Sequence, residues 1–287
     1  MAVKTAVVLV RADDSHFMSQ EAGVFVEAIR RELGDVNVLV GFIPAREPVA
    51  YLKEMFRTLM SAGQVASVVA ISCPREVYCY LATLDVPFAI GGSVYADSDV
   101  IPSVDADNRE AGLLLTKHLL KKGCRRIILL STMEGLPGEH DFHDGTSQAL
   151  VEMNLPPTTL LVCAYPSGHQ ELLAFLRHLM HSNNPPDAFI CHGAYMAEQV
   201  RLALEELALD QAKQPEIVYD GPPLASGSPN HQVYAATQKG FTQIAQMIAA
   251  LLGKIGRGEP LSEQRVIIPV ELYGISQIHT TARRVRS

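Results

Sequence analysis

The densest group of side chains able to do chemistry lies in the segment EGLPGEHDFHDG, which contains His140, Asp141, His143 and Asp144. Two imidazoles at the spacing H-x-x-H could share a metal ion, and the carboxylates could act as further ligands or as acid and base groups. The segment lacks the H-E-x-x-H arrangement, and its histidines stand beside Gly and Pro residues, before the predicted helix. We therefore favour a solvated loop that leads into a helix, and we predict no metal site.

The other reactive groups and cofactor motifs give little support for catalysis. Cys73 precedes Pro74 at a predicted helix start, where the dipole would lower a thiol pKa, but we favour a small buried thiol at a strand end. The five cysteines are odd in number and free of C-x-x-C, as is typical of unpaired thiols in a reducing compartment. After the first predicted strand, VLVRADDSHF contains neither a Walker A loop nor G-x-G-x-x-G, and G-x-S-x-G is absent as well. We expect no catalytic residues, no cofactor and no enzyme activity.

The composition argues against proteins that coat nucleic acid and against proteins that span a membrane. The chain has 287 residues with 24 Lys and Arg against 31 Asp and Glu, a formal net charge of −7, which argues against a protein that coats nucleic acid. With 48% hydrophobic and 19% charged residues, the chain can bury a large core. No window approaches the roughly 20 apolar residues of a membrane span, and the N-terminal segment lacks a signal cleavage site. We expect a cytoplasmic protein with no membrane partner.

Short apolar runs alternate along the chain with longer segments of helical periodicity. The runs cover residues 5–10, 36–40, 67–71, 87–90, 126–130, 159–163, 188–191, 216–219 and 232–235. The helical segments cover residues 19–33, 47–62, 75–84, 108–122, 144–153, 169–181, 195–207 and 240–255. Continuous apolar strands joined by helices predict parallel, doubly wound sheets that are covered on both faces.

These strands and helices are too many for one doubly wound sheet. The sequence therefore predicts two α/β lobes of ordinary domain size. We expect the N-terminal lobe to comprise residues 1–123 and 237–264, and the C-terminal lobe to comprise residues 124–236 and 265–287. Short connections between them predict a hinge with a cleft between the lobes. The longest irregular segment, residues 220–231, falls late in the second lobe, and loops of this length are usually functional or mobile.

Three segments resemble a known family. Residues 102–131 contain D-N-x-x-A-G, H-L-L-x-x-G and R-R-I elements, residues 185–209 contain M-A-x-x-x-x-x-A-L, and residues 216–225 read EIVYDGPPLA. In this order and spacing, followed by residues 237–260 and a final strand RVIIPVEL, they resemble the effector-binding core of LacI/GalR-family transcriptional regulators. The resemblance extends over nearly the whole chain, from about Lys4 to Leu272.

The resemblance implies a type I periplasmic-binding-protein-like fold, in which two lobes close on a small ligand and two chains pair as a homodimer. It also implies a helix-turn-helix in front of the core, and this chain begins within a few residues of its first strand. We therefore expect the chain to sense an effector, such as a sugar, nucleoside or aromatic metabolite. We expect DNA contact only through a domain that this chain does not contain.

Ligands of open α/β sheets bind beyond the carboxyl ends of the strands. The candidates at these positions are Asp13, Ser15 and Phe17 after the first strand, Ser72 after the third, His192 after the seventh and Asp220 after the eighth. Asp220 matches a family carboxylate that accepts ligand hydrogens, and we favour this role over an Asx turn. Phe17 could stack on a ligand ring or pack on the first helix, whereas His192 is more often a hydrogen-bonded loop residue.

Two further candidates depend on the same comparison. Tyr195 begins a predicted helix and could line the cleft or cover its mouth. Phe142 stands where the family usually has an arginine, and Gly193 and Ala194 replace a common Asn-Asp pair. These departures remove polar donors, so we expect hydroxyl-rich sugars to bind less well. Two alternatives then stay open: a less polar effector, such as a flat aromatic one held by Phe17, Phe142 and Tyr195, or the loss of ordinary sensing.

Two other functions stay open at this stage. A stand-alone solute-binding protein of a transport system would share the fold but would need export. A metal-dependent enzyme would use the histidines and aspartates of residues 140–144 in the cleft. Neither has a sequence motif of its own in this chain.

Overall fold

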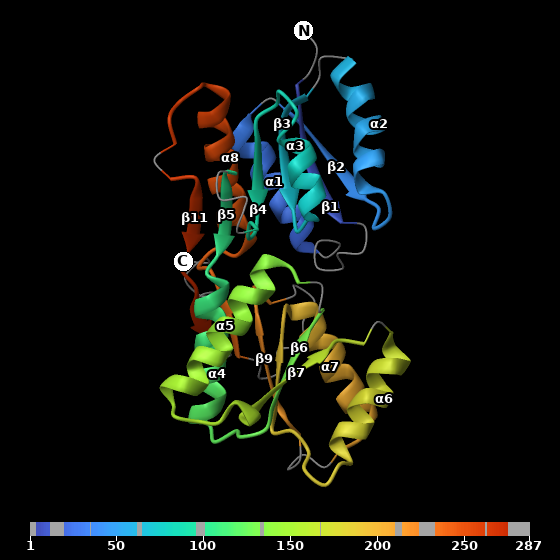
Figure 1. Cartoon of the computed structure of the whole chain (residues 1–287), viewed down its shortest axis with the longest axis vertical. Coiled ribbons are helices and arrows are strands. Elements are labelled where there is room, and N and C mark those ends of the chain that lie inside the picture. The colour runs from blue at the N-terminus through green and yellow to red at the C-terminus, as the bar shows by residue number, and fades with distance from the viewer. Residues whose placement is uncertain are drawn as a thin grey trace, which may run out of the picture. The chain divides into compact units, whose positions relative to one another are not determined.

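The computed structural model describes residues 4–11, 20–34, 36–61, 65–95, 101–132, 135–166, 168–209, 214–223, 233–261 and 263–274. The chain divides into two compact units. Unit 1 comprises residues 1–106, 136–138 and 239–268, and unit 2 comprises residues 107–135, 139–238 and 269–287. Each unit contains one six-stranded sheet with helices on both faces (Figure 1).

The sheet of unit 1 is parallel throughout, in the order β11-β5-β4-β3-β1-β2. Its strands are β1 (Thr5–Arg11), β2 (Asn37–Ile43), β3 (Val65–Ile71), β4 (Phe88–Gly91), β5 (Ser103–Ala106) and β11 (Arg265–Ile268). Its helices are α1 (Gln20–Leu33), α2 (Pro48–Ser61), α3 (Arg75–Leu81) and α8 (Phe241–Gly256). This sheet has one hydrophobic core on each face, and successive side chains of β1 point into alternate cores. Val7 and Leu9 pack with α2 and α3, whereas Val8 and Val10 pack with α1 and α8.

The sheet of unit 2 has the order β12-β10-β9-β8-β6-β7 and is parallel except for β12, which runs antiparallel to β10. Its strands are β6 (Ile127–Ser131), β7 (Leu160–Ala164), β8 (Ala188–Cys191), β9 (Glu216–Asp220), β10 (Val233–Ala236) and β12 (Glu271–Tyr273). Its helices are α4 (Asn108–Lys121), α5 (Pro137–Glu152), α6 (His169–Met180) and α7 (Ala194–Glu206), with a short 3-10 turn η2 (Pro157–Thr159).

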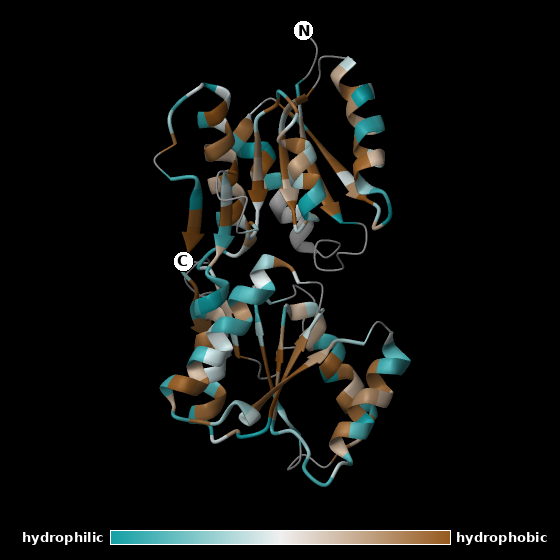
Figure 2. Cartoon of the chain, viewed as in Figure 1, coloured by the Kyte–Doolittle hydropathy of each residue, from teal (hydrophilic) through white to brown (hydrophobic). Residues whose placement is uncertain are grey.

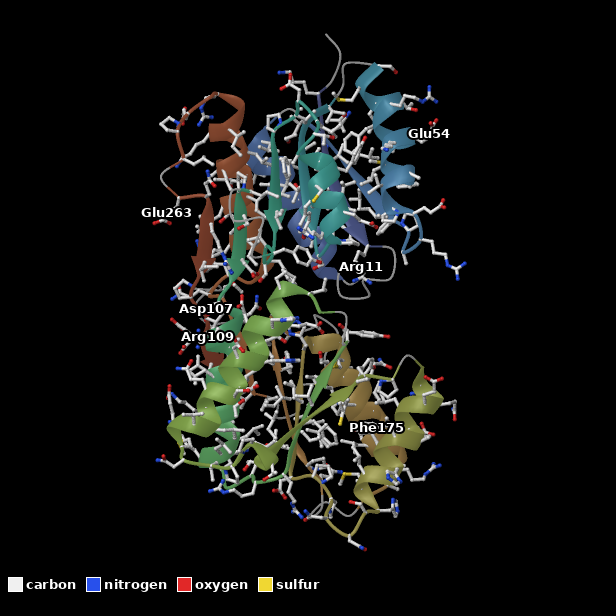
Figure 3. The ribbon with its side chains drawn as sticks, viewed as in Figure 1. Arg11, Glu54, Asp107, Arg109, Phe175 and Glu263 are labelled. Carbon is white, nitrogen blue, oxygen red and sulfur yellow. The ribbon has the colours of Figure 1, made fainter. Side chains whose placement is uncertain are left out.

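The apolar strands of both sheets lie between helices whose polar residues face outward, as the hydropathy colouring shows (Figure 2). In unit 2, α6 and α7 cover one face of the sheet with a core that includes Leu130, Phe189 and Leu176. Phe175 of α6 packs against the same core (Figure 3). The predicted class of two α/β units with doubly wound, mostly parallel sheets is confirmed.

Helices α4 and α5 approach each other closely through two glycines of unit 2. A Cβ added to Gly112 of α4 would lie 2.3 Å from the carbonyl oxygen of Phe142, and one added to Gly145 of α5 would lie 1.9 Å from that of Arg109. Any side chain at these positions would therefore collide with backbone. The Asp107 carboxylate begins α4 by accepting a hydrogen bond of 2.9 Å from the Glu110 N–H.

The structure differs from the sequence prediction in several local points. Helix α5 begins at Pro137, so residues 140–144 lie within a helix and not in the predicted loop. Proline is tolerated at the first helical position because its missing N–H would be unpaired there. Strand β5 was not predicted, since its four residues include Asp105, and the predicted final strand is two strands separated at Pro269.

Two elements lie in a different unit from the one in which the sequence placed them. Helix α4 belongs to unit 2, where it packs against β9 and β10, whereas the predicted division assigned it to the N-terminal lobe. Strand β11 belongs to unit 1, because it pairs with β5 in the register Arg265 to Ser103. Among the described residues, none of the helices combines the length and the apolar character that a membrane crossing requires.

Candidate functional site

The candidate site lies at the carboxyl edge of the sheet of unit 2, where the strand order reverses between β6 and β8. Such a switch point is the usual ligand position of an open α/β sheet. The register pairs Leu130 with Cys191 and Cys191 with Tyr219. The next residues along these strands, Ser131, His192 and Asp220, therefore lie side by side at this edge, and they face away from the core beneath α6 and α7.

Glu139, in the first turn of α5, is the most buried carboxylate of this edge, with 3% of its surface exposed. Its Oε1 accepts hydrogen bonds from the Ser131 hydroxyl at 2.9 Å, the Thr132 N–H at 3.0 Å and the Thr132 hydroxyl at 2.5 Å. Burial raises the pKa of Glu139, but these hydrogen bonds and the nearby His192 outweigh it, and the net pKa is lowered. Glu139 is therefore an ionised group that holds the end of β6 onto α5.

Asp220, at the end of β9, holds the loop between β8 and α7. Its Oδ1 accepts a hydrogen bond of 2.6 Å from the Gly193 N–H, and its Oδ2 lies 2.9 Å from Nδ1 of His192. Gly193 has a φ of +102°, which a residue with a Cβ rarely adopts. The side chain of Asp220 is 14% exposed and that of His192 is 27% exposed. Sequence reasoning identified both residues but not their contact with each other.

Phe142 lies beneath this pair and is almost completely buried, with 1% of its surface exposed. Its ring centroid is 5.3 Å from that of His192, at an interplanar angle of 46°. The structure thus places the Phe142 ring behind the imidazole of His192, which it supports. From the sequence, we expected the Phe142 ring to be open to a ligand. His143, one residue on, has a lowered pKa, mainly because of burial and against the opposing effect of Glu139.

Two tyrosines border the same edge on the side of α6 and α7. Tyr165 follows β7, and its N–H donates to the Ser131 carbonyl at 2.8 Å. Burial raises the pKa of Tyr165 to about 12, with smaller contributions from Tyr195 and Cys191. Tyr195 is the second residue of α7 and is 37% exposed. Tyr195 was predicted as a site residue, whereas Tyr165 was missed because a single aromatic after an edge strand has no distinguishing pattern.

The carboxyl edge of unit 1 contains a second polar group. Ser72 follows β3 with a φ of +50°, a conformation uncommon for a residue with a side chain. The Ser93 hydroxyl donates to Asp105, which is 8% exposed and also accepts from the Ala106 N–H at 2.8 Å. Cys73 is buried, as predicted, and its N–H donates to the Tyr78 hydroxyl at 3.2 Å.

Three predicted site residues, Asp13, Ser15 and Phe17, lie outside the described residues. Within the described ranges, no group of three or more His, Cys, Asp or Glu side chains is arranged to hold a metal ion. Glu139 and Asp105 are the polar residues that sequence reasoning missed. A glutamate two positions after a helix-starting proline is a signal that could have indicated Glu139.

A family model matches the middle of the chain. Residues 116–210 match the model of the periplasmic binding protein-like domain family. No curated protein matches the chain in sequence. The matched residues contain α5, β6 and β8 and thus most of the candidate site.

Solved structures of LacI-family regulators share the fold over nearly their whole length. A regulatory protein of the LacI family from Chloroflexus aggregans has a TM-score of 0.77 at 20% identity, covering 93% of this chain and 96% of that chain. A periplasmic binding protein/LacI transcriptional regulator from Alkaliphilus metalliredigens QYMF, complexed with D-xylulofuranose, has a TM-score of 0.75 at 18% identity, covering 94% and 97%. A LacI family regulator from Enterococcus faecium with bound ribose has the same values. The predicted resemblance and the type I periplasmic-binding-protein-like fold are confirmed.

Proposed function

We propose that this chain is the small-molecule effector-binding core of a LacI/GalR-like transcriptional regulator. The observation that carries this proposal is the set of polar side chains, Glu139, His192 and Asp220, gathered at the switch point of the unit 2 sheet in a periplasmic-binding-protein-like fold. Relatives with this fold are complexed with D-xylulofuranose, cellobiose or ribose, which supports a small organic effector. The predicted contacts from Asp13, Ser15, Phe17, Ser72 and Tyr195 belong to the same proposal.

The mechanism follows from linkage between binding and conformation. An effector that contacts both units binds their closed arrangement better than their open one, and it shifts the equilibrium only by that difference in affinity. The closed arrangement then favours one geometry of a dimer, and a DNA-binding domain outside this chain would read that geometry. We place this regulator in the cytoplasm, with neither a cofactor nor a catalytic step.

Exposed apolar side chains on the edge strands β2 and β7 support a homodimer. Leu39 and Phe42 are exposed on β2 at the edge of one sheet, and Leu161 and Val162 are exposed on β7 at the edge of the other. Exposed apolar strand edges make a monomer prone to aggregation, and packing against a second chain would bury them. Sedimentation velocity tests this proposal: the chain should sediment as a dimer, and Phe42→Glu should shift it toward monomer.

A thermal-shift screen across sugars, nucleosides, amines and aromatic acids tests effector binding. A ligand that binds only the folded state raises the melting temperature by mass action, and small-angle scattering of the liganded protein should show a more compact particle. A bound ligand with no effect on particle dimensions would contradict the closure mechanism. The absence of any binding across the screen would contradict the sensor function itself.

A further inference from the structure

The side chain of Asp220 meets two nitrogen atoms of the loop between β8 and α7, one with each carboxylate oxygen. Oδ1 accepts the Gly193 N–H at 2.6 Å, and Oδ2 lies 2.9 Å from Nδ1 of His192. The two contacts join the end of β9 to consecutive residues of one loop. Asp220 is thus placed to fix the orientation of the His192 ring as well as the loop backbone.

The contact with Asp220 decides which nitrogen of the imidazole carries a hydrogen. An ionised carboxylate offers only lone pairs, and a bare Nδ1 at 2.9 Å would bring another lone pair against them. Nδ1 of His192 therefore carries a hydrogen in the neutral ring as well as in the imidazolium. The proton that the ring gains and loses is then the one on Nε2.

The packing around His192 makes Nε2 the nitrogen that a ligand can approach. Nδ1 is buried, and the Phe142 ring covers one side of the imidazole at a centroid distance of 5.3 Å. The side chain of His192 is nevertheless 27% exposed, compared with 14% for that of Asp220. The more exposed member of the pair is thus the imidazole, at the sheet edge where ligands of open α/β sheets bind.

The titratable groups around the His192 ring come from three elements. Asp220 of β9 and Glu139 of α5 stabilise a positive charge on the imidazole, and the same interaction contributes to the lowered pKa of Glu139. His143 of α5 opposes that charge, but burial lowers the pKa of His143 and favours its neutral form. Burial also raises the pKa of Cys191, the preceding residue of β8, which stays an uncharged thiol.

The two tyrosines at this edge add phenol groups. Burial raises the pKa of Tyr165, which follows β7, to about 12, so its phenol is neutral. Tyr195, in the first turn of α7, has an exposed side chain. Imidazoles are the side chains that ordinarily change charge between about pH 5 and 8, so the hydrogen-bonding character of this edge near neutral pH depends on His192.

We propose that Asp220 is a positioning residue for His192, and that the unprotonated Nε2 of this imidazole is the acceptor that meets the effector. The inference rests on the proposed function, because it names the atom that recognises the ligand. A neutral Nε2 accepts a hydrogen bond from a hydroxyl or N–H group, whereas a protonated Nε2 cannot. Acidification therefore weakens the binding of such an effector. Each oxygen of Asp220 can accept a further hydrogen bond, so a ligand contact of its own is compatible with this role.

NMR of the imidazole nitrogens tests the positioning role on the whole chain, without any ligand. Long-range proton–nitrogen correlation spectra distinguish a protonated nitrogen from one with a lone pair. We expect neutral His192 to carry its hydrogen on Nδ1 and to titrate at Nε2. The exposed pair of His169 and Glu206 is the internal reference, because there Nε2 lies 2.9 Å from the carboxylate and should carry the hydrogen. A neutral His192 with its hydrogen on Nε2 would overturn the proposal.

Two variants test whether Asp220 controls the proton on His192. Asp220→Asn removes the charge beside Nδ1 and keeps the size of the side chain. The titration midpoint of His192 should fall by at least about one pH unit, because a close opposite charge favours the protonated ring. Glu206→Gln removes the carboxylate of the reference pair and should leave the His192 midpoint unchanged. An unchanged midpoint in Asp220→Asn, or an equal shift in both variants, would overturn the proposal.

Diethyl pyrocarbonate tests whether a small molecule reaches Nε2, since it acylates an imidazole nitrogen that has a lone pair. Mass spectrometry of the native chain should show modification of His192, at a rate that falls as the pH falls through its NMR midpoint. Protection of His192 at every pH would overturn the role of Nε2 as a ligand contact.

Calorimetry then tests the effect of pH on ligands from the thermal-shift screen that carry hydroxyl or N–H groups, ribose and adenosine among them. Affinity should fall about tenfold for each pH unit below the His192 midpoint, and this dependence should disappear in His192→Gln. A ligand whose affinity is unaffected by pH would overturn the role of Nε2 while leaving the chain a small-molecule sensor. A screen without any binding would instead contradict the sensor function, and the effector role of Nε2 with it.

Discussion

The close crossing of α4 and α5 makes Gly145 a sensitive position, and Gly145→Ala is expected to destabilise the protein. The new Cβ would lie 1.9 Å from the Arg109 carbonyl oxygen and 2.9 Å from the Leu113 nitrogen. Both are backbone atoms of α4, so the clash cannot be relieved by a side-chain rotation. The helices would have to separate by roughly 1 Å or more, which costs about 3 kcal/mol, the upper end for overpacking.

Alanine recovers part of this cost, because it is a better helix former than glycine by about 1 kcal/mol. We therefore expect a net loss of about 2 kcal/mol in the free energy of unfolding. With a urea m-value of about 2 kcal/mol per molar, the midpoint would fall by about 1 M. Circular dichroism during urea unfolding measures this shift. The same variant should also displace Glu139 and Phe142, which the α5 helix positions.

Gly23→Ala on α1 is the matched control, since a Cβ at Gly23 has nothing within 4 Å. This change should raise stability by up to about 1 kcal/mol through helix propensity alone. A Gly145→Ala midpoint that is unchanged or higher than that of the wild type would refute the tight crossing.

Four further predictions follow from single sites. Asp220→Ala should weaken effector affinity by about 1 to 3 kcal/mol, because it leaves a polar ligand group and the Gly193 N–H without their acceptor. Calorimetry measures this loss, and an unchanged affinity would contradict a ligand contact from Asp220. Because the folded pKa of Glu139 is lowered, the stability that its charge contributes is present above about pH 4.5 and is lost as the pH falls through the lowered pKa. Glu139→Gln should therefore reduce the fall of the urea midpoint between pH 6 and pH 3. A fall equal to that of the wild type would argue against an ionised Glu139. Ser72→Gly should raise the free energy of unfolding by about 1 kcal/mol, because Ser72 has a φ of +50°, whereas a lower midpoint would mean that its side chain is needed. Iodoacetamide should label the exposed Cys79 in the native protein far faster than Cys191, whose pKa is raised by burial, and mass spectrometry showing early modification of Cys191 would contradict the packing.

The apolar runs predicted most of the sheet strands because a strand covered on both faces needs little else in its sequence. The same reasoning failed for β5, because Asp105 interrupts the apolar run. The Asp105 carboxylate accepts a hydrogen bond from the Ser93 hydroxyl, and no local sequence pattern indicates this partner. It also misplaced α4, since a helix's own periodicity shows that it packs on a sheet but not on which sheet.

The candidate site was predicted in part. His192 and Asp220 were placed at strand ends from the alternation of elements, but their contact depends on the pairing of β8 with β9, which the sequence of either strand alone does not specify. Glu139 was missed because Pro137 and Gly138 were interpreted as loop residues, although proline is favourable at the start of a helix. Phe142 was expected to face a ligand and instead is buried behind His192.

The most direct test of the effector-sensor function is a binding site mapped by NMR on the whole chain with the best ligand from the thermal-shift screen. The account predicts that the largest amide shifts in unit 2 occur at the ends of β6, β8 and β9, at Thr132, Gly193 and Asp220. Saturable binding that leaves these amides unshifted would contradict it.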